Sequence, residues 1–153
     1  IDAALRIESR YFIKTAATPQ AKGMIRTLFV NMQALGKGGN RPEGYPTYEI
    51  KKVAVLGAGL MGAGIAYVQA KAGIETVLLD VSQEAAEKGK AYSKRIVDKD
   101  ISRGKITKEK GDALLALITP STDYSLIKGS DLVVEAVFES PALKAEVTKK
   151  AEA

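Results

Sequence analysis

The chain has 153 residues, of which 46% are hydrophobic and 27% are charged. This length and apolar content suit one α/β domain with a buried core, and they exclude a disordered tail. No stretch has the roughly 18 to 20 apolar residues that cross a bilayer, and no basic-then-apolar leader stands at the start. The sequence therefore predicts a protein with no membrane span and no secretory signal.

Charge and two missing residue types narrow the chemistry further. The formal charge is +5, from 23 basic and 18 acidic side chains, and the few aromatic residues do not interleave with basic ones as a base-stacking surface requires. We expect no nucleic-acid partner. Cysteine and histidine are both absent from the sequence, which removes disulfides, thiolate metal ligands and the commonest general base. We therefore expect no metal site.

The first fifty residues predict helices followed by a linker. Apolar residues at helical spacing are already present at residues 3–12, so we expect a piece of a longer protein. A second helix is predicted after Thr18 and Pro19, an N-cap and first-turn pair, with an apolar stripe that reaches Leu35. Residues 36–49 are rich in glycine and proline, which is typical of a loop. We treat residues 1–50 as a helical linker segment.

From residue 51 onward, strand-like and helix-like stretches alternate. Strands are predicted at residues 52–56, 76–79 and 132–136, the last of them buried. Helices are predicted at residues 60–72, at 82–101, from 107 to about 118, and from 143 to the chain end. Such alternation implies right-handed crossovers and a parallel sheet covered on both faces. Residues 51–153 therefore predict a doubly wound α/β domain of the Rossmann type, truncated at its C-terminus.

The most informative motif is the glycine-rich turn GAGLMG at residues 57–62, between the first predicted strand of this domain and the helix after it. Gly57 permits a tight turn, Gly59 lets the backbone approach a pyrophosphate, and Gly62 lets the helix pack closely on the sheet. The helix N-terminus offers free N–H groups and a positive dipole end to that pyrophosphate. The motif predicts a dinucleotide site, with Met61 either as a wall of the cleft or as a core residue.

An acidic residue follows at the spacing expected for a ribose-binding carboxylate. Asp80 ends the next predicted strand, 23 residues after Gly57. A carboxylate there accepts hydrogen bonds from ribose hydroxyls and repels a 2′-phosphate, and no arginine follows at residues 81–83. The sequence therefore predicts NAD rather than NADP. The alternative for Asp80 is a solvated strand-end acid or an N-cap of the next helix.

Two more acids lie near the end of the strand 132–136, at the edge of the sheet where such folds bind ligands. Glu139 is predicted to face the nicotinamide side of the cleft, and the alternative is a cap for the helix at Pro141. Glu135 is either paired or at the cleft rim, and we assign it no role. The basic residues between Lys99 and Lys110 either touch an anionic substrate or form a solvated loop.

Several stretches together resemble a known family. They are GAGLMGAGIA at 57–66, LLDVS at 78–82, TPSTDYSLIKGSDLVVEAVFE at 119–139, and Lys144. These stretches resemble the NAD-binding domain of L-3-hydroxyacyl-CoA dehydrogenases. Residues 1–50 are similar to the helices that link an enoyl-CoA hydratase region to this domain in the multifunctional α-subunit of the fatty-acid β-oxidation complex. The VVEAVFE segment with Lys144 is the more specific part, because many dehydrogenases share the glycine-rich turn.

The resemblance implies roles for individual residues. Met61 and Asp80 contact the adenosine half of NAD, and the helix that carries Ser93 approaches the CoA moiety of the substrate. Together with the turn, the residues expected to bind the cofactor are Gly57, Gly59, Leu60, Met61, Gly62, Asp80, Val137, Phe138, Glu139 and Lys144. The catalytic histidine and glutamate of the family are expected downstream, so no catalytic residue is predicted within this chain.

The resemblance also implies a parent enzyme of fatty-acid β-oxidation that oxidises L-3-hydroxyacyl-CoA to 3-ketoacyl-CoA with NAD and hydrates enoyl-CoA. It implies an acyl-CoA substrate, a thiolase subunit as partner and a cytoplasmic location of the bacterial type. We expect the fragment alone to bind NAD and to be inactive. Two alternatives stay open: a regulatory NAD-sensing module without chemistry, and a dehydrogenase of the 3-hydroxyisobutyrate type.

Overall fold

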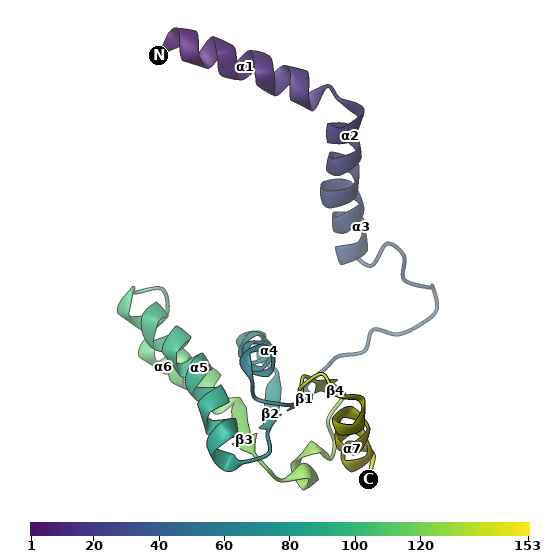
Figure 1. Cartoon of the computed structure of the whole chain (residues 1–153), viewed down its shortest axis with the longest axis vertical. Helices are drawn as coiled ribbons and strands as arrows, with labels where there is room; N and C mark the ends of the chain where they lie inside the picture. The colour runs from purple at the N-terminus through teal and green to yellow at the C-terminus, as the bar shows by residue number, and fades with distance from the viewer. The chain divides into compact units, whose positions relative to one another are not determined.

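The computed structural model describes all 153 residues, and the chain divides into two compact units, Ile1–Thr47 and Tyr48–Ala153. The first unit is helical (Figure 1). Its elements are α1 (Asp2–Ala16), α2 (Pro19–Ile25), the π-helix η1 (Arg26–Asn31) and α3 (Met32–Gly36). As predicted, the Thr18 side chain accepts a hydrogen bond from the Ala21 amide and Pro19 opens the helix.

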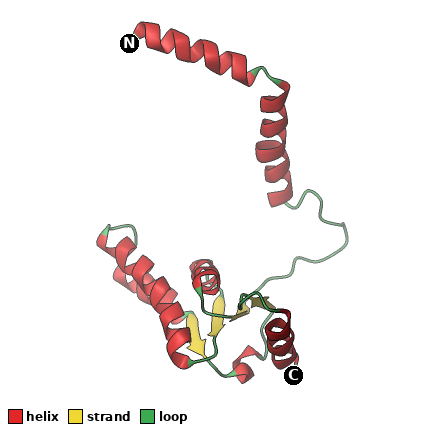
Figure 2. Cartoon of the chain, in the orientation of Figure 1, coloured by secondary structure: helices red, strands yellow, loops and turns green.

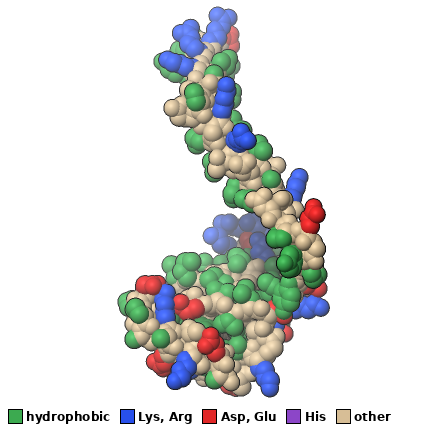
Figure 3. Space-filling view, turned by 90° about the vertical axis from the view of Figure 1, so that its right-hand side faces the viewer, with side chains coloured by type: hydrophobic (Ala, Val, Ile, Leu, Met, Phe, Trp, Pro, Cys, Tyr) green, Lys and Arg blue, Asp and Glu red, His purple; other side chains and the backbone are tan.

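The helices of the first unit bury none of their side chains. Hydrophobic side chains therefore lie at the surface of these helices (Figure 3). Among them are Met24, Leu28, Phe29, Met32 and Leu35 of the predicted apolar stripe. Isolated helices of this length gain most of their stability from packing an apolar face, and this unit supplies no such packing itself.

The second unit alternates strands and helices (Figure 2). Its strands are β1 (Lys52–Leu56), β2 (Glu75–Leu79), β3 (Ile118–Ser121) and β4 (Leu132–Glu135). Its helices are α4 (Leu60–Lys71), α5 (Gln83–Ser102), α6 (Lys108–Ala116), the 3₁₀-helix η2 (Tyr124–Ile127) and α7 (Pro141–Glu152). All strand pairs are parallel, in the order β3-β2-β1-β4.

Alternating side chains of the central strands divide the core into two layers. Val53 and Val55 of β1 join a cluster with Ala66 and Ala70 of α4. Ala54 and Leu56 join a second cluster with Val147 of α7 and with η2. Successive strand residues point to opposite faces, so a strand buried on both faces is apolar throughout. The sheet is thus covered on both sides, which confirms the predicted doubly wound α/β class.

The outer strands differ from the sequence prediction. The helix expected to reach about residue 118 ends at Ala116, and Ile118 instead pairs with Thr76 of β2 and is fully buried. Pro120 is tolerated in β3 because this strand lies at the sheet edge. At the other edge, Leu132 and Val133 of β4 are exposed, since β4 has one neighbouring strand. The expected burial of that strand is therefore wrong for its first half.

Candidate cofactor site

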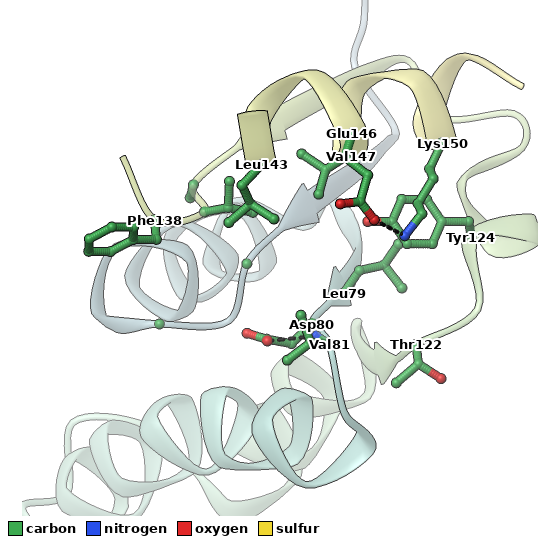
Figure 4. A pocket seen from close by; sticks show the side chains of 14 residues that line it. Leu79, Asp80, Val81, Thr122, Tyr124, Phe138, Leu143, Glu146, Val147 and Lys150 are labelled. Atoms are coloured by element: carbon green, nitrogen blue, oxygen red, sulfur yellow. Dashed lines mark hydrogen bonds and ion pairs between the residues drawn. The ribbon is translucent and has the colours of Figure 1, made fainter. Parts of the chain in front are cut away.

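A cavity of about 560 Å³ lies at the carboxyl edge of the sheet (Figure 4). Strand order reverses between β1 and β4, because β2 follows on one side of β1 and β4 lies on the other. Open α/β sheets bind ligands at such a point. The cavity is lined by Gly57, Gly59, Leu79, Asp80, Val81, Thr122, Tyr124, Ala136, Val137, Phe138, Leu143, Glu146, Val147 and Lys150.

Two glycines of the turn are required by the packing around them. Gly57 has a φ of +100°, and a Cβ there would lie 2.6 Å from the Ala136 carbonyl oxygen at the end of β4. A Cβ on Gly62 would overlap the Gly57 carbonyl oxygen and lie 3.3 Å from Val55 of β1. These contacts match the tight turn and the close packing of helix on sheet that the sequence predicts for Gly57 and Gly62.

Gly59 has open space where the other two glycines have neighbours. A Cβ added to Gly59 would meet no atom within 4 Å, although Gly59 lines the cavity. Gly59 is also the N-cap of α4, and no side chain accepts a hydrogen bond from the first turn of this helix. By contrast, Ser82 caps α5 and Thr107 caps α6. The α4 amides are therefore open to an anion, as the diphosphate of a dinucleotide requires.

The Asp80 carboxylate lies beside this turn. One oxygen accepts a hydrogen bond from the Ala58 amide at 2.6 Å, and the other accepts one from the Val81 amide at 2.7 Å. Asp80 lies across the cavity from α7 (Figure 4). Because Ser82 caps α5, Asp80 is not the N-cap that the sequence left open. Each carboxylate oxygen has further lone pairs, which suit ribose hydroxyls.

The segment after β4 forms the opposite part of the cavity wall, through Val137 and Phe138. Glu135, at the end of β4, accepts a hydrogen bond from the Val137 amide at 2.7 Å. The Lys144 ammonium on α7 lies 3.3 Å from Glu135 and 2.8 Å from Glu139. Hydrogen bonds to Glu139 and then Glu135 raise the pKa of Lys144 above its ordinary value. Glu139 thus pairs with Lys144 and does not cap α7, whose N-cap is Ser140.

Some predicted residues do not line the large cavity. Met61 is exposed, and Leu60 lines a smaller hollow between the turn and α5. Glu139 and Lys144 stand beside the cavity without lining it. The Ser93 side chain is completely buried on the inner face of α5, and the approach of this helix to the CoA moiety stays a prediction. Helix α5 packs against α4 and β3.

Other lining residues were not predicted. Leu143, Val147 and Lys150 lie on one face of α7, and Thr122 and Tyr124 follow β3. Helical spacing of Leu143, Val147 and Lys150 could have revealed the α7 face, but not what it faces. Gly89 was also missed: a Cβ there would lie 2.7 Å from the Ala58 Cβ, so its absence lets α5 approach the glycine-rich turn.

The structure contains no cluster of His, Cys, Asp or Glu side chains arranged to hold a metal ion. None of its helices has the length and apolar character needed to traverse a bilayer. What the sheet edge does offer is an open helix N-terminus and, beside it, a fixed carboxylate at the end of the neighbouring strand, and Gly59 and Asp80 line the same cavity. These features define a dinucleotide-binding α/β domain.

Comparison with known proteins gives the particular family. The family model described as "3-hydroxyacyl-CoA dehydrogenase, NAD binding domain" matches residues 52–153. The chain belongs to this family, and NAD is the cofactor of the domain. The resemblance drawn from the VVEAVFE segment and Lys144 is thereby confirmed.

Solved structures agree with this family. The (S)-3-hydroxybutyryl-CoA dehydrogenase of Ralstonia eutropha is 36% identical, with a TM-score of 0.64 over 68% of this chain and 37% of that one. The 3-hydroxybutyryl-CoA dehydrogenase of Escherichia coli is 34% identical, with a TM-score of 0.61 over 67% and 23%. The dehydrogenase part of multifunctional enzyme 1 from C. elegans is 27% identical, with a TM-score of 0.57 over 69% and 24%. The chain thus spans less than half of each.

Proposed function

We propose that this chain is the NAD-binding part of an enzyme that oxidises L-3-hydroxyacyl-CoA to 3-ketoacyl-CoA in fatty-acid β-oxidation. The observation that carries the proposal is the pairing of an open α4 N-terminus at Gly59 with the fixed Asp80 carboxylate, on one cavity, in a chain of this family. Bound NAD would supply the hydride acceptor, and the protein would bind and orient it.

The proposed contacts with NAD come from residues that follow three neighbouring strands, β2, β1 and β4. In this proposal the amides that open α4, at Leu60, Met61 and Gly62, hold the diphosphate, and Asp80 accepts the hydroxyls of the adenosine ribose. Val137 and Phe138 form the wall beside the nicotinamide half. Glu139 and Lys144 lie next to that wall as an ion pair and contact the cofactor from there.

The proposal extends to the parent protein. We infer an enoyl-CoA hydratase region before this domain and a thiolase subunit as partner, in a bacterial-type cytoplasm. Support comes from the helices of the first unit, whose apolar stripe is exposed, and from the likeness to the dehydrogenase part of a multifunctional enzyme. An apolar stripe of this size suits a helix segment that packs on another domain.

The oxidation also needs a base to take the substrate's hydroxyl proton. No acid in or beside the cavity is placed for this in our proposal. Of the two acids that line it, Asp80 is bonded to two amides and Glu146 is paired with Lys150. Beside the cavity, Glu135 and Glu139 are paired with Lys144. The catalytic histidine and its glutamate partner are expected in the part of the parent that follows residue 153. The isolated chain should therefore bind NAD without turnover.

Two measurements test the proposal. Isothermal titration should give saturable binding of NAD and much weaker binding of NADP. An assay with acetoacetyl-CoA and NADH should show no oxidation of NADH by the isolated chain, and activity should appear when the coding sequence is extended by about one domain, on the order of 150 residues. Saturable turnover by the isolated chain would place the base inside residues 1–153. A lack of NAD binding would overturn the proposal.

A further inference from the structure

Glu135 carries two interactions that none of the roles above explains. It is the last residue of β4 and pairs in register with Leu56, the last residue of β1. One carboxylate oxygen accepts the Val137 amide at 2.7 Å, and the other lies 3.3 Å from the Lys144 ammonium. The same side chain therefore holds the chain that leaves the sheet and a cation on the helix that follows.

The first interaction fixes the start of the cavity wall. The Ala136 amide still donates to the Leu56 carbonyl at 2.8 Å, so the sheet holds the backbone up to this point. Val137 is the next residue and has left the ladder, and its amide is bonded to Glu135 instead. Val137 and Phe138 line the cavity directly after this bond. Glu135 thus sets where that wall begins.

The second interaction fixes the Lys144 ammonium. Its two carboxylate partners differ in exposure, since the Glu139 side chain is 85% exposed and the Glu135 side chain is 28% exposed. An ion pair with a freely solvated partner contributes little and exchanges readily with water. Glu135 is held by the Val137 amide, so its carboxylate is the fixed partner. Glu135 would therefore hold Lys144 even without the exposed Glu139 carboxylate.

We propose that Glu135 is a positioning residue for NAD, which holds Val137 and the Lys144 ammonium at the β4 side of the cavity. The inference rests on the proposed cofactor roles of Val137 and Lys144. Glu135 itself does not line the cavity, so it acts through these two groups. The strand order β2-β1-β4 separates this region from Asp80 by one strand. A change at Glu135 should therefore weaken binding of the nicotinamide half of NAD and leave binding of the adenosine diphosphate half unchanged.

The two halves of the cofactor give a direct test. In the proposed site, ADP contacts only the glycine-rich turn and Asp80, whereas NADH also contacts the residues that follow β4. The variant Glu135→Gln keeps an oxygen for the Val137 amide and removes the charge that holds Lys144. We expect it to weaken NADH binding by about fivefold or more, as for loss of a charged hydrogen-bond partner, and to leave ADP binding within about twofold. A general loss of folding would weaken the binding of NADH and ADP equally.

A double-mutant cycle isolates the route through Lys144. Lys144→Ala should weaken NADH binding, and adding Glu135→Gln to it should cause little further loss. Asp112→Asn is the matched control, because it removes one negative charge from an exposed pair with Lys108 on α6, away from the cavity. Its affinity for NADH should equal that of the unaltered chain.

The outcomes separate two failures. Suppose that the unaltered chain binds NADH. The positioning role is then wrong if Glu135→Gln binds NADH equally well, if its affinity for ADP falls as much as its affinity for NADH, or if the losses from Glu135→Gln and Lys144→Ala add in full. In each of these cases the proposed function still stands. If the unaltered chain binds no NADH, the proposed function fails and this inference with it.

Discussion

The Ala58 amide donates a 2.6 Å hydrogen bond to the carboxylate of Asp80, which ties the glycine-rich turn after β1 to the end of β2. The acid that we assign to the ribose therefore also shapes the turn that we assign to the diphosphate. A second bond, from the Val81 amide at 2.7 Å, fixes the carboxylate itself. Substitutions of Asp80 should accordingly change both cofactor choice and the geometry of the turn.

Cofactor choice is the first prediction. Replacing Asp80 with Ser and Val81 with Arg should weaken NAD binding by about tenfold or more, because the carboxylate that accepts the ribose hydroxyls is lost. NADP binding should improve, because the carboxylate no longer repels the 2′-phosphate and the arginine provides a cation for it. Val81 is almost fully exposed and lines the cavity, so an arginine fits there. Titration with both cofactors measures the change. Equal affinities of the unaltered chain for NAD and NADP would remove the ribose role of Asp80.

The glycines of the turn give a second prediction. Gly59→Ala should leave stability nearly unchanged, since its Cβ meets no protein atom, and should weaken NAD binding by about tenfold or more because the methyl group occupies the path of the diphosphate. Gly62→Ala should instead destabilise the fold by about 1–3 kcal/mol or more through overpacking against Gly57. Thermal unfolding and NAD titration of both variants separate the two effects. Full NAD affinity of Gly59→Ala would contradict the assignment.

The turn and Asp80 could be predicted because their spacing is read within one short strand–helix–strand stretch. The bonds of Glu135 to Val137 and Lys144 could not, because the pattern does not say whether an acid at a strand end points to solvent or to the following helix. β3 was missed because four residues that include Pro120 have too little strand character of their own. Ile118 becomes a strand residue through tertiary pairing with β2.

Gly89 supports the turn from the side of α5, which gives a third prediction. A Cβ at this position would lie 2.7 Å from the Ala58 Cβ and 2.9 Å from the Ala58 oxygen. Gly89→Ala should therefore lower stability by about 1–3 kcal/mol and also weaken NAD binding, because Ala58 belongs to the turn. The matched control is Gly64→Ala on α4, where a Cβ meets nothing within 4 Å. That variant should gain about 0.5–1 kcal/mol.

Denaturant unfolding of both glycine variants measures these changes. If Gly89→Ala is as stable as Gly64→Ala, the close approach of α5 to Ala58 does not contribute to the stability of the fold. If Gly89→Ala loses stability but binds NAD normally, the turn does not depend on α5.

The last prediction concerns acid stability at the other end of the sheet. Asp131, directly before β4, accepts hydrogen bonds from the Lys52 amide at 2.9 Å, the Lys51 amide at 2.7 Å and the Tyr48 hydroxyl at 2.7 Å. These bonds, those from the Lys52 and Lys51 amides first, hold the pKa of Asp131 below its ordinary value. They join the starts of β1 and β4.

Because its folded-state pKa is lowered, Asp131 contributes stability that is fully present above its ordinary pKa of about 4 and is lost as the pH falls through the folded-state pKa. Asp131→Asn should therefore be less stable than the unaltered chain at pH 7, and the difference should shrink below about pH 4. Thermal unfolding at a series of pH values measures this. Asp98→Asn, which removes an exposed acid paired with Lys94 on α5, is the control. A constant difference between Asp131→Asn and the unaltered chain across the acid range would show that the Asp131 bonds do not depend on its charge.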